Sequence, residues 1–227
     1  PMIKTTFTLI SKKLLTHDVY ELTYSCPEIS KESPKPGQYV MFQLAPGLSR
    51  AYSIALFSDT GFTLIIKRIA DGKWSPIICD AEISTVFSGM IPLGHFTLRD
   101  TSNNKCFIGT GTGFAPLYCQ MLASSVSDNQ PEQVAFIFWV RDNGDTFYKD
   151  EITTLGERFS DFTSVPYLSR WDLPGYEKGY VTDWITNEHI RSYEEFYLCG
   201  SPAMVKSARE KLESLGVMKE QIFWEQY

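Results

Sequence analysis

Short apolar and alternating runs, separated by turn-forming dipeptides, dominate the first hundred residues. These runs are rich in β-branched and aromatic residues, as strands are. They lie at residues 7–10, 19–24, 39–44 and 62–67, with a further candidate at 82–87. Pro-Gly or Asp-Gly pairs interrupt them at 36–37, 46–47 and 71–72. Short strands at this spacing predict an antiparallel β-barrel.

The pattern changes after a polar, loop-like segment at residues 100–105. Strand-like and helix-like runs then alternate, which predicts βαβ units around a parallel sheet. The expected strands are residues 106–109, 134–140 and 195–199, and the expected helices are 116–124, 149–158 and 202–215. We therefore predict two domains: an antiparallel β-barrel over residues 1–99, followed by an α/β doubly wound parallel-sheet domain over residues 100–227.

Charge and cysteine content narrow the possible functions. Residues 1–99 carry 10 basic and 8 acidic side chains and residues 100–227 carry 11 and 19, for a net charge of −6, which argues against nucleic-acid binding. No run approaches the roughly 20 apolar residues of a membrane helix, and we expect no membrane span and no export signal. Five scattered cysteines without a C-x-x-C pair predict neither a metal nor an iron–sulfur site. They favour a reducing compartment, so the cytoplasm is expected.

A glycine-rich loop lies between a predicted strand and a predicted helix of the second domain. It reads Gly109-Thr110-Gly111-Thr112-Gly113-Phe114-Ala115-Pro116. Glycines let a backbone turn sharply and approach an anion closely, and the positive end of a helix favours a pyrophosphate. A tight turn alone would give a similar pattern, but the strand–loop–helix context favours a dinucleotide site.

A second candidate, Arg50-Ala51-Tyr52-Ser53, ends an extended segment of the predicted barrel. Such residues are also common on a barrel rim, although Arg can bind phosphate with two N–H groups and Tyr can cover a ring face. A third element is Cys199-Gly200-Ser201-Pro202-Ala203-Met204. With these three elements in this order, the chain resembles the ferredoxin–NADP⁺ reductase family, which has R-x-Y-S, G-T-G-T-G-x-x-P and C-G-x-P-x-M motifs. The resemblance covers nearly the whole chain.

The resemblance implies an FAD site on the barrel domain. Arg50 would bind the FAD pyrophosphate, Tyr52 would lie along the isoalloxazine or ribityl chain, and Ser53 would donate a hydrogen bond near flavin N5. Backbone groups of Ile66 and Lys67 would meet the pyrimidine edge. A turn similar to the family's G-x-x-S turn, which holds phosphate, contains Gly72, Trp74 and Ser75.

The resemblance also implies a nicotinamide nucleotide site on the second domain. Cys199 would lie near the nicotinamide C4, and it has no activating base in the sequence that would make it a nucleophile. The ending Glu225-Gln226-Tyr227 is similar to the Glu-x-Tyr ending of plant-type members. Tyr227 would be a displaceable cover of the flavin and Glu225 a proton or charge partner, so the candidate catalytic residues are Ser53, Cys199, Glu225 and Tyr227. The nucleotide-binding residues implied are Gly109, Thr110, Gly111, Thr112, Gly113, Pro116, Cys199, Gly200, Pro202 and Met204.

The nucleotide preference depends on residues 168–180. Ser169 and Arg170 resemble an S-R element beside the ribose, and Lys178 with Tyr180 is similar to a K-x-Y pair of NADPH-using members. Basic side chains suit the 2′-phosphate of NADPH. Trp171 and Asp172 interrupt the basic character, and a solvated loop would look alike. The sequence leans towards NADPH over NADH.

The function implied is that of an FAD-dependent oxidoreductase with hydride transfer between nicotinamide C4 and flavin N5. A separate one-electron carrier, ferredoxin or flavodoxin, is the expected partner. Two alternatives stay open: an NAD(P)H:flavin reductase that uses free flavin as substrate, and a reductase or electron-transfer subunit of a multicomponent oxygenase or other complex.

Overall fold

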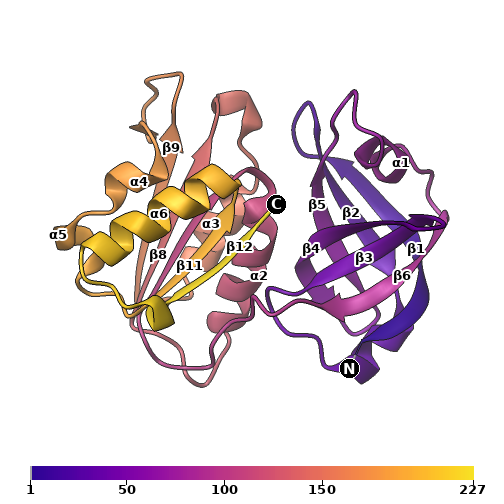
Figure 1. Cartoon of the computed structure of the whole chain (residues 1–227), viewed down its shortest axis with the longest axis horizontal. Helices are drawn as coiled ribbons and strands as arrows, with labels where there is room; N and C mark the ends of the chain where they lie inside the picture. The colour runs from indigo at the N-terminus through magenta and orange to yellow at the C-terminus, as the bar shows by residue number, and fades with distance from the viewer. Residues whose placement is uncertain (1) are drawn as a thin grey trace. The chain divides into compact units, whose positions relative to one another are not determined.

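The computed structural model describes residues 2–227, which divide into two compact units (Figure 1). The first unit comprises the residues up to Leu98 together with Tyr118–Gln120, and the second comprises Arg99–Leu117 and Met121–Tyr227. No helix within residues 2–227 has the length and apolar content needed to cross a membrane.

The first unit is a closed antiparallel barrel with the strand order β1-β2-β5-β4-β3-β6. A short 3₁₀ helix, η1, follows β2, and the helix α1 lies between β5 and β6. The strands are β1 Ile3–Leu14, β2 Val19–Ser25, β3 Tyr39–Ala45, β4 Leu48–Ser58, β5 Gly61–Lys67 and β6 Val86–Leu93; the helices are η1 Pro27–Glu32 and α1 Ser75–Cys79. The predicted antiparallel barrel is confirmed.

Aromatic side chains fill the centre of this barrel. The ring of Phe7 lies 4.9 Å from that of Phe42 and 5.3 Å from that of Phe62, both in edge-to-face contact. Tyr24 stacks on Phe62 at 5.3 Å, and all four side chains are buried. Alternate residues of a strand point to the same side, so these rings come from inward positions on four different strands.

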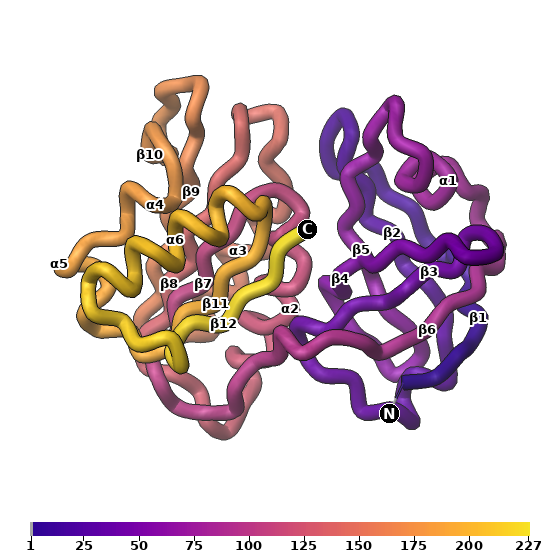
Figure 2. The backbone as a smooth tube through the Cα atoms, in the orientation of Figure 1, coloured from indigo at the N-terminus to yellow at the C-terminus, as the bar shows by residue number. Residues whose placement is uncertain are grey.

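The second unit is a parallel sheet with the strand order β10-β9-β8-β7-β11-β12, and every neighbouring pair is parallel. Helices α4 and α6 lie on one face and α2 and α3 on the other (Figure 2). The strands are β7 Lys105–Thr110, β8 Gln133–Val140, β9 Asp161–Leu168, β10 Glu177–Lys178, β11 Glu195–Gly200 and β12 Ile222–Gln226. The helices are η2 Gly111–Gly113, α2 Phe114–Ser124, η3 Asn143–Asp145, α3 Lys149–Gly156, α4 Val181–Trp184, α5 Asn187–Ile190, α6 Pro202–Ser214 and η4 Lys219–Gln221. The predicted doubly wound domain is confirmed, and coverage of both faces explains why its central strands are largely apolar.

Two expectations about the barrel strands were wrong. Residues 82–85 are a turn rather than the start of a strand: Thr85 N–H donates to the carbonyl of Glu82, and Ser84 has a φ of +76°. The strand therefore begins only at Val86. The segment at Arg50 does not end an extended run either, because β4 continues to Ser58.

Candidate functional site

The barrel ladder is interrupted between β4 and β5. The β4–β5 pairs run from Ile54↔Leu64 to Ser58↔Gly61. The earlier part of β4 pairs with β3, for example Tyr52 with Val40, and the later part of β5 pairs with β2, for example Ile66 with Tyr20. Residues 48–53 of β4 and 65–67 of β5 thus lie beyond the end of the β4–β5 ladder.

The residues expected to contact a flavin ring lie where the β4–β5 ladder ends. Tyr52 and Ser53 lie on the β4 edge, and Ile66 and Lys67 lie on the β5 edge. Burial raises the pKa of Tyr52 to about 12, so its hydroxyl stays protonated at neutral pH and can donate a hydrogen bond. The chemistry of these edges fits a planar ligand with both donors and acceptors along one side.

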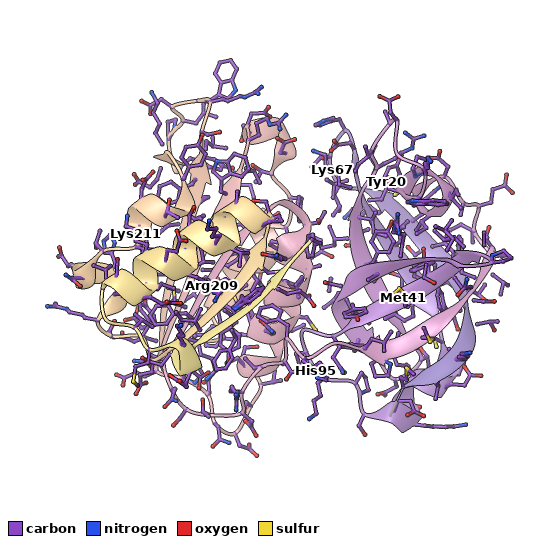
Figure 3. The ribbon with its side chains drawn as sticks, in the orientation of Figure 1. Tyr20, Met41, Lys67, His95, Arg209 and Lys211 are labelled. Atoms are coloured by element: carbon purple, nitrogen blue, oxygen red, sulfur yellow. The ribbon has the colours of Figure 1, made fainter. Side chains whose placement is uncertain are left out.

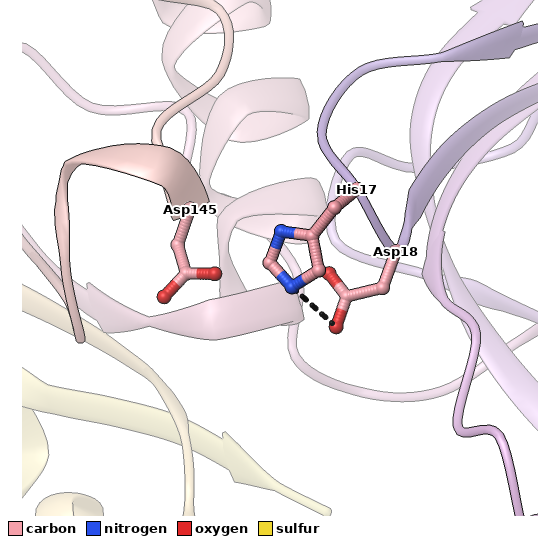
Figure 4. Close-up of side chains that lie close together, drawn as sticks. All are labelled: His17, Asp18 and Asp145. Carbon is pink, nitrogen blue, oxygen red and sulfur yellow. Dashed lines mark ion pairs between the residues drawn. The ribbon is translucent and has the colours of Figure 1, made fainter.

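The side chain of Lys67 is engaged elsewhere. Its Nζ lies 3.2 Å from Asp18 Oδ2 in the turn between β1 and β2 (Lys67 in Figure 3). His17 Nε2 lies 3.5 Å from the same oxygen, as Figure 4 shows. The contact with Asp18 holds the ammonium group at the turn, so the side chain of Lys67 is not needed for the predicted backbone contact with the pyrimidine edge.

Arg50 and Trp74 come together although they are far apart in sequence. The guanidinium carbon of Arg50 lies 5.3 Å from the centre of the Trp74 ring, and one N–H donates to the carbonyl of Ser49 at 3.0 Å. The flat indole supports the exposed guanidinium from one side. A guanidinium has five N–H donors in a planar fork, so this arrangement fits a phosphate or pyrophosphate.

Ser75 begins the five-residue helix α1 and is buried. Its Oγ accepts a hydrogen bond from Ile69 N–H at 2.9 Å, and Gly72 N–H donates to the carbonyl of Ile69 at 2.9 Å. The hydroxyl thus closes its own turn and keeps its proton as a donor. The G-x-x-S turn expected from the sequence is therefore compact and compatible with a phosphate.

The glycine-rich loop closes tightly against β11. A Cβ at Gly113 would lie 2.2 Å from the carbonyl oxygen of Cys199, so only glycine fits between η2 and that strand. Gly111 has a φ of +54°, and a Cβ there would meet nothing within 4 Å. One side of the loop is thus packed and the other is open at the amino end of α2, which suits an approaching anion.

A cavity of about 270 Å³ opens beside this loop. We call it the Trp139 cavity; its lining includes Thr110, Trp139, Tyr180, Ser201 and Met204. Trp139 Nε1 is buried and has no hydrogen-bond partner within residues 2–227, while its ring stacks on Tyr180 at 6.0 Å. A buried N–H without a partner costs roughly 1–3 kcal/mol, so an acceptor atom of a ligand would fit here.

The residues expected to select NADPH lie at the same end of the sheet. Ser169 and Arg170 directly follow β9, and Lys178 lies in β10, where it pairs with Leu168. Tyr180 lines the Trp139 cavity. The carboxyl ends of parallel strands, where these residues lie, are the usual ligand-binding edge of such a sheet.

Cys199 is fully buried, with its Sγ 3.7 Å from the hydroxyl of Tyr227. Burial raises the pKa of the Cys199 thiol well above its usual range, so the thiol stays neutral and is no nucleophile. Tyr227 N–H donates to the carbonyl of Gly200 at 3.4 Å, and Glu225 pairs with Cys199 between β12 and β11. The three carboxyl-terminal residues are thus aligned with the C-G-x-P-x-M segment.

Two residues beside the Trp139 cavity were not among the binding residues expected from the sequence. They are Trp139 and Ser201, the first variable position of the C-G-x-P-x-M motif. Ser201 Oγ accepts from Met204 N–H at 3.3 Å and caps α6, and Ser201 N–H donates to Thr110 Oγ1 at 3.3 Å. Ser201 precedes a proline at the start of a helix, which is the signal of a cap. Trp139 is the penultimate residue of an apolar parallel strand, and its position at the ligand-binding edge could have identified it.

The two units are thus a closed antiparallel barrel and a parallel-sheet domain with a glycine-rich loop at the start of a helix. Residues 107–210 match the oxidoreductase NAD-binding domain family. Over 226 residues the chain is 34% identical to the reductase component of propane 2-monooxygenase from Rhodococcus jostii, covering 94% of this chain and 60% of that protein. It is 26% identical over 218 residues to the electron transfer component of toluate 1,2-dioxygenase from Pseudomonas putida, covering 94% and 64%.

Solved structures show the same fold. The cytochrome P450 reductase GcoB of Amycolatopsis superposes with a TM-score of 0.86 at 23% identity, over 100% of this chain and 70% of that one. A ferredoxin NADP⁺ reductase from Neisseria gonorrhoeae with bound FAD and NADP gives 0.81 at 21% identity, over 98% of both chains. This fold and the match of residues 107–210 agree with the resemblance to the ferredoxin–NADP⁺ reductase family that the sequence motifs indicate. The chain spans about three fifths of the length of the curated relatives that it matches.

Proposed function

We propose that this chain is a flavin-dependent reductase that takes electrons from NAD(P)H and passes them to a separate electron-accepting component. The observation that carries the proposal is that one chain has two sites, one whose chemistry suits a flavin and one whose chemistry suits a nicotinamide nucleotide. The barrel unit has the end of the β4–β5 ladder, with Arg50 on Trp74, and the second unit has the glycine-rich loop with the Trp139 cavity. FAD, when bound, would supply the chemistry that accepts two electrons as hydride and releases them singly.

On the barrel unit, each group has a role that its surroundings support. Arg50, supported by Trp74, would hold the pyrophosphate together with the Ser75 turn. Tyr52 and Ser53 would line the ring and the ribityl chain from β4. The backbone of Ile66 and Lys67 would complete the other edge.

On the second unit, the open side of the loop would hold the nucleotide pyrophosphate. The N–H of Trp139 would donate to the nucleotide, and the neutral Cys199 would pack near the nicotinamide without taking part in covalent chemistry. Arg170 and Lys178 support NADPH as the donor, because their charges suit a 2′-phosphate. The roles of Glu225 and Tyr227 stay as predicted from the sequence.

The acceptor proposed is the next component of an oxygenase system. The relatives named above are the reductase or electron-transfer components of propane and toluate oxygenases. A ferredoxin or flavodoxin as one-electron carrier is compatible with this role, and reduction of free flavin is the alternative that the following experiment separates.

The experiment is a visible spectrum of the chain, purified without added flavin and desalted, before and after anaerobic addition of NADPH or NADH. Retained flavin absorbance that one nucleotide bleaches supports a reductase with held FAD and identifies its donor. A colourless protein that reduces added flavin indicates the free-flavin reductase. A colourless protein that neither binds FAD nor oxidises either nucleotide refutes the proposal.

A pair of variants tests the flavin site itself. Arg50→Ala should weaken FAD binding by about tenfold or more, because a charge-assisted pair of hydrogen bonds to phosphate is lost. Lys31→Ala removes one positive charge from the exposed helix η1 of the same unit and should leave FAD affinity unchanged. Equal FAD dissociation constants for the two variants would contradict the assignment of Arg50.

A further inference from the structure

A second, larger cavity lies on the other face of the parallel sheet. It has a volume of about 630 Å³, within the range of small-molecule sites. Phe136, Phe138 and Phe162 form its floor on β8 and β9, and Thr153 and Glu157 line it from α3. Phe138 and Trp139 are consecutive strand residues and point to opposite faces, so this aromatic cavity and the Trp139 cavity lie back to back across β8.

The lining of the aromatic cavity indicates a flat, apolar ligand. The rings of Phe136 and Phe138 stack at 5.4 Å with an angle of 22° between their planes, and Phe147 and Tyr148 also line the cavity. Walls made of ring faces and edges select planar aromatic molecules over flexible chains.

Few polar groups line the cavity, and they indicate which polar group and what charge a ligand would have. Tyr176 hydroxyl donates to Thr146 Oγ1 at 3.2 Å, so this pair offers one further donor and several acceptor positions. Lys149 Nζ lies 5.2 Å from the centre of the Tyr176 ring, and Glu157 also lines the cavity. One lining charge of each sign favours a neutral ligand over an anion or a cation.

Three connections join the aromatic cavity to the glycine-rich loop and the Trp139 cavity. Phe114 lines the aromatic cavity and directly follows Gly113, and its ring lies 5.4 Å from that of Phe138. Strand β8 contributes Phe138 to one cavity and Trp139 to the other. The segment around β10 contributes Tyr176 to the aromatic cavity and Tyr180 to the Trp139 cavity. A ligand that moves any of these groups acts on both sides of the sheet.

We propose that the aromatic cavity binds a neutral, planar aromatic molecule carrying one hydroxyl or carbonyl group, and that its occupancy changes the affinity of the nucleotide site. The binding rests only on the cavity, whereas the coupling rests on the function proposed above. The hydroxyl or carbonyl meets the Thr146–Tyr176 pair, and the rings lie among the phenylalanines. The cavity is thereby an effector site for aromatic compounds on the nucleotide-binding domain.

The test uses 2-naphthol as the probe and calorimetric titration of the flavin-loaded chain. Thr153 and Thr154 are neighbouring, exposed residues of α3, and only Thr153 lines the aromatic cavity. Thr153→Trp should fill the cavity and weaken 2-naphthol binding by about tenfold or more, whereas Thr154→Trp should stay within about twofold of the parent. Ser164→Phe, which blocks the cavity from β9, is a second variant that gives the same answer if Thr153→Trp fails to fold.

The coupling is measured by titrating NADP⁺ and NAD⁺ with and without saturating 2-naphthol. We expect the nucleotide dissociation constant to change by about fivefold in the parent and in Thr154→Trp, and not in Thr153→Trp. Equal binding of 2-naphthol by both tryptophan variants overturns the site, and tighter binding of the anion 2-naphthoate overturns the preference for a neutral ligand. Naphthol binding that leaves the nucleotide constant unchanged overturns the coupling. If neither nucleotide binds while the variants still differ towards 2-naphthol, the proposed function fails and the aromatic site stands.

Discussion

A buried ion pair joins the amino-terminal ends of β7 and β11 and gives a sharp test of what stabilises the sheet. Lys105 Nζ lies 3.3 Å from Glu195 Oε2, with the two side chains 1% and 6% exposed. The ammonium group also donates to the carbonyls of Thr101 and Asn103 at 2.7 and 3.0 Å. Tyr197 hydroxyl donates to Glu195 Oε2 at 2.6 Å, so every polar atom of the pair lies in a network.

Glu195→Gln keeps the size and the hydrogen-bonding oxygen of this side chain but removes its charge. Breaking a buried pair from one side typically costs about 3–5 kcal/mol, because the remaining charge has no counter-charge. The two carbonyls still accept from Lys105, so the lower end, about 3 kcal/mol of the free energy of unfolding, is expected. The control is Glu210→Gln, whose partner Lys206 lies 3.9 Å away in a pair that is 75% and 68% exposed. It should change the free energy of unfolding by less than about 0.5 kcal/mol.

The assay is urea unfolding followed by circular dichroism, with the midpoint and the slope compared between variants. Lys105→Met combined with Glu195→Gln should recover most of the loss, because no unpaired charge remains buried. If Glu195→Gln shifts the midpoint no more than Glu210→Gln does, the pair is hydrated in solution and the reasoning is refuted.

The same variant should show a pH dependence of defined sign. Burial lowers the pKa of Lys105 below its usual range, and loss of the carboxylate lowers it further. Between the folded and the unfolded pKa, the unfolded chain binds more protons than the folded chain. The free energy of unfolding of Glu195→Gln should therefore rise with pH in that window, relative to the Glu210→Gln control.

Three further predictions concern the glycine-rich loop, Trp139 and the cysteines. Gly113→Ala should weaken nucleotide binding by about tenfold or more in equilibrium titration, because its Cβ would lie 2.2 Å from a backbone oxygen, whereas Gly111→Ala should keep the fold and cost about 1 kcal/mol of the free energy of unfolding. Trp139→Phe should weaken nucleotide binding by roughly fivefold through the lost N–H donor, and an unchanged dissociation constant would contradict that role. All five cysteines are free and buried, so a thiol-reactive dye at pH 8 should label none of them in the native chain and all of them in urea. Rapid labelling of Cys199 in the native chain would contradict the burial of its thiol.

The sequence predicted the general architecture because each half carries a strong local pattern. In the barrel, short strands rich in Phe, Ile and Thr separated by turn-forming pairs already define an antiparallel arrangement. In the second half, the alternation of apolar strands with longer helical runs leaves few alternatives to a parallel sheet. The glycine-rich loop was located by its motif, whose chemistry is local to six or seven residues.

The strands at or next to the two edges of the parallel sheet, β9, β10 and β12, were not predicted, for a physical reason. Strand β9 contains Pro166 and two exposed residues, so it lacks the apolar run that marked its neighbour β8. Strand β10 has only two residues, and β12 has a single buried residue followed by half-buried and exposed ones. Such strands are defined by the partner to which they pair, and a single sequence contains no record of that pairing.

The contacts that make the candidate sites depend on the same long-range pairing. Arg50 meets Trp74 across 24 positions of the printed sequence, and Ser201 meets Thr110 across 91. No local pattern predicts either contact, because both follow from which strands become neighbours. The motif residues could be named from the sequence, but the groups that hold them in place could not.

In strand β8, the register of strand pairing decides which cavity each side chain lines. Its eight residues are almost uniformly apolar, so no alternation tells which side chains face which layer of helices. Pairing with β7 and β9 places Phe136 and Phe138 on the α3 side and Trp139 on the other. A shift of one residue in this register would exchange the two faces, and with them the aromatic cavity and the Trp139 cavity. The neighbouring strands, rather than the composition of β8 itself, therefore determine which ligand each face of the sheet can accept.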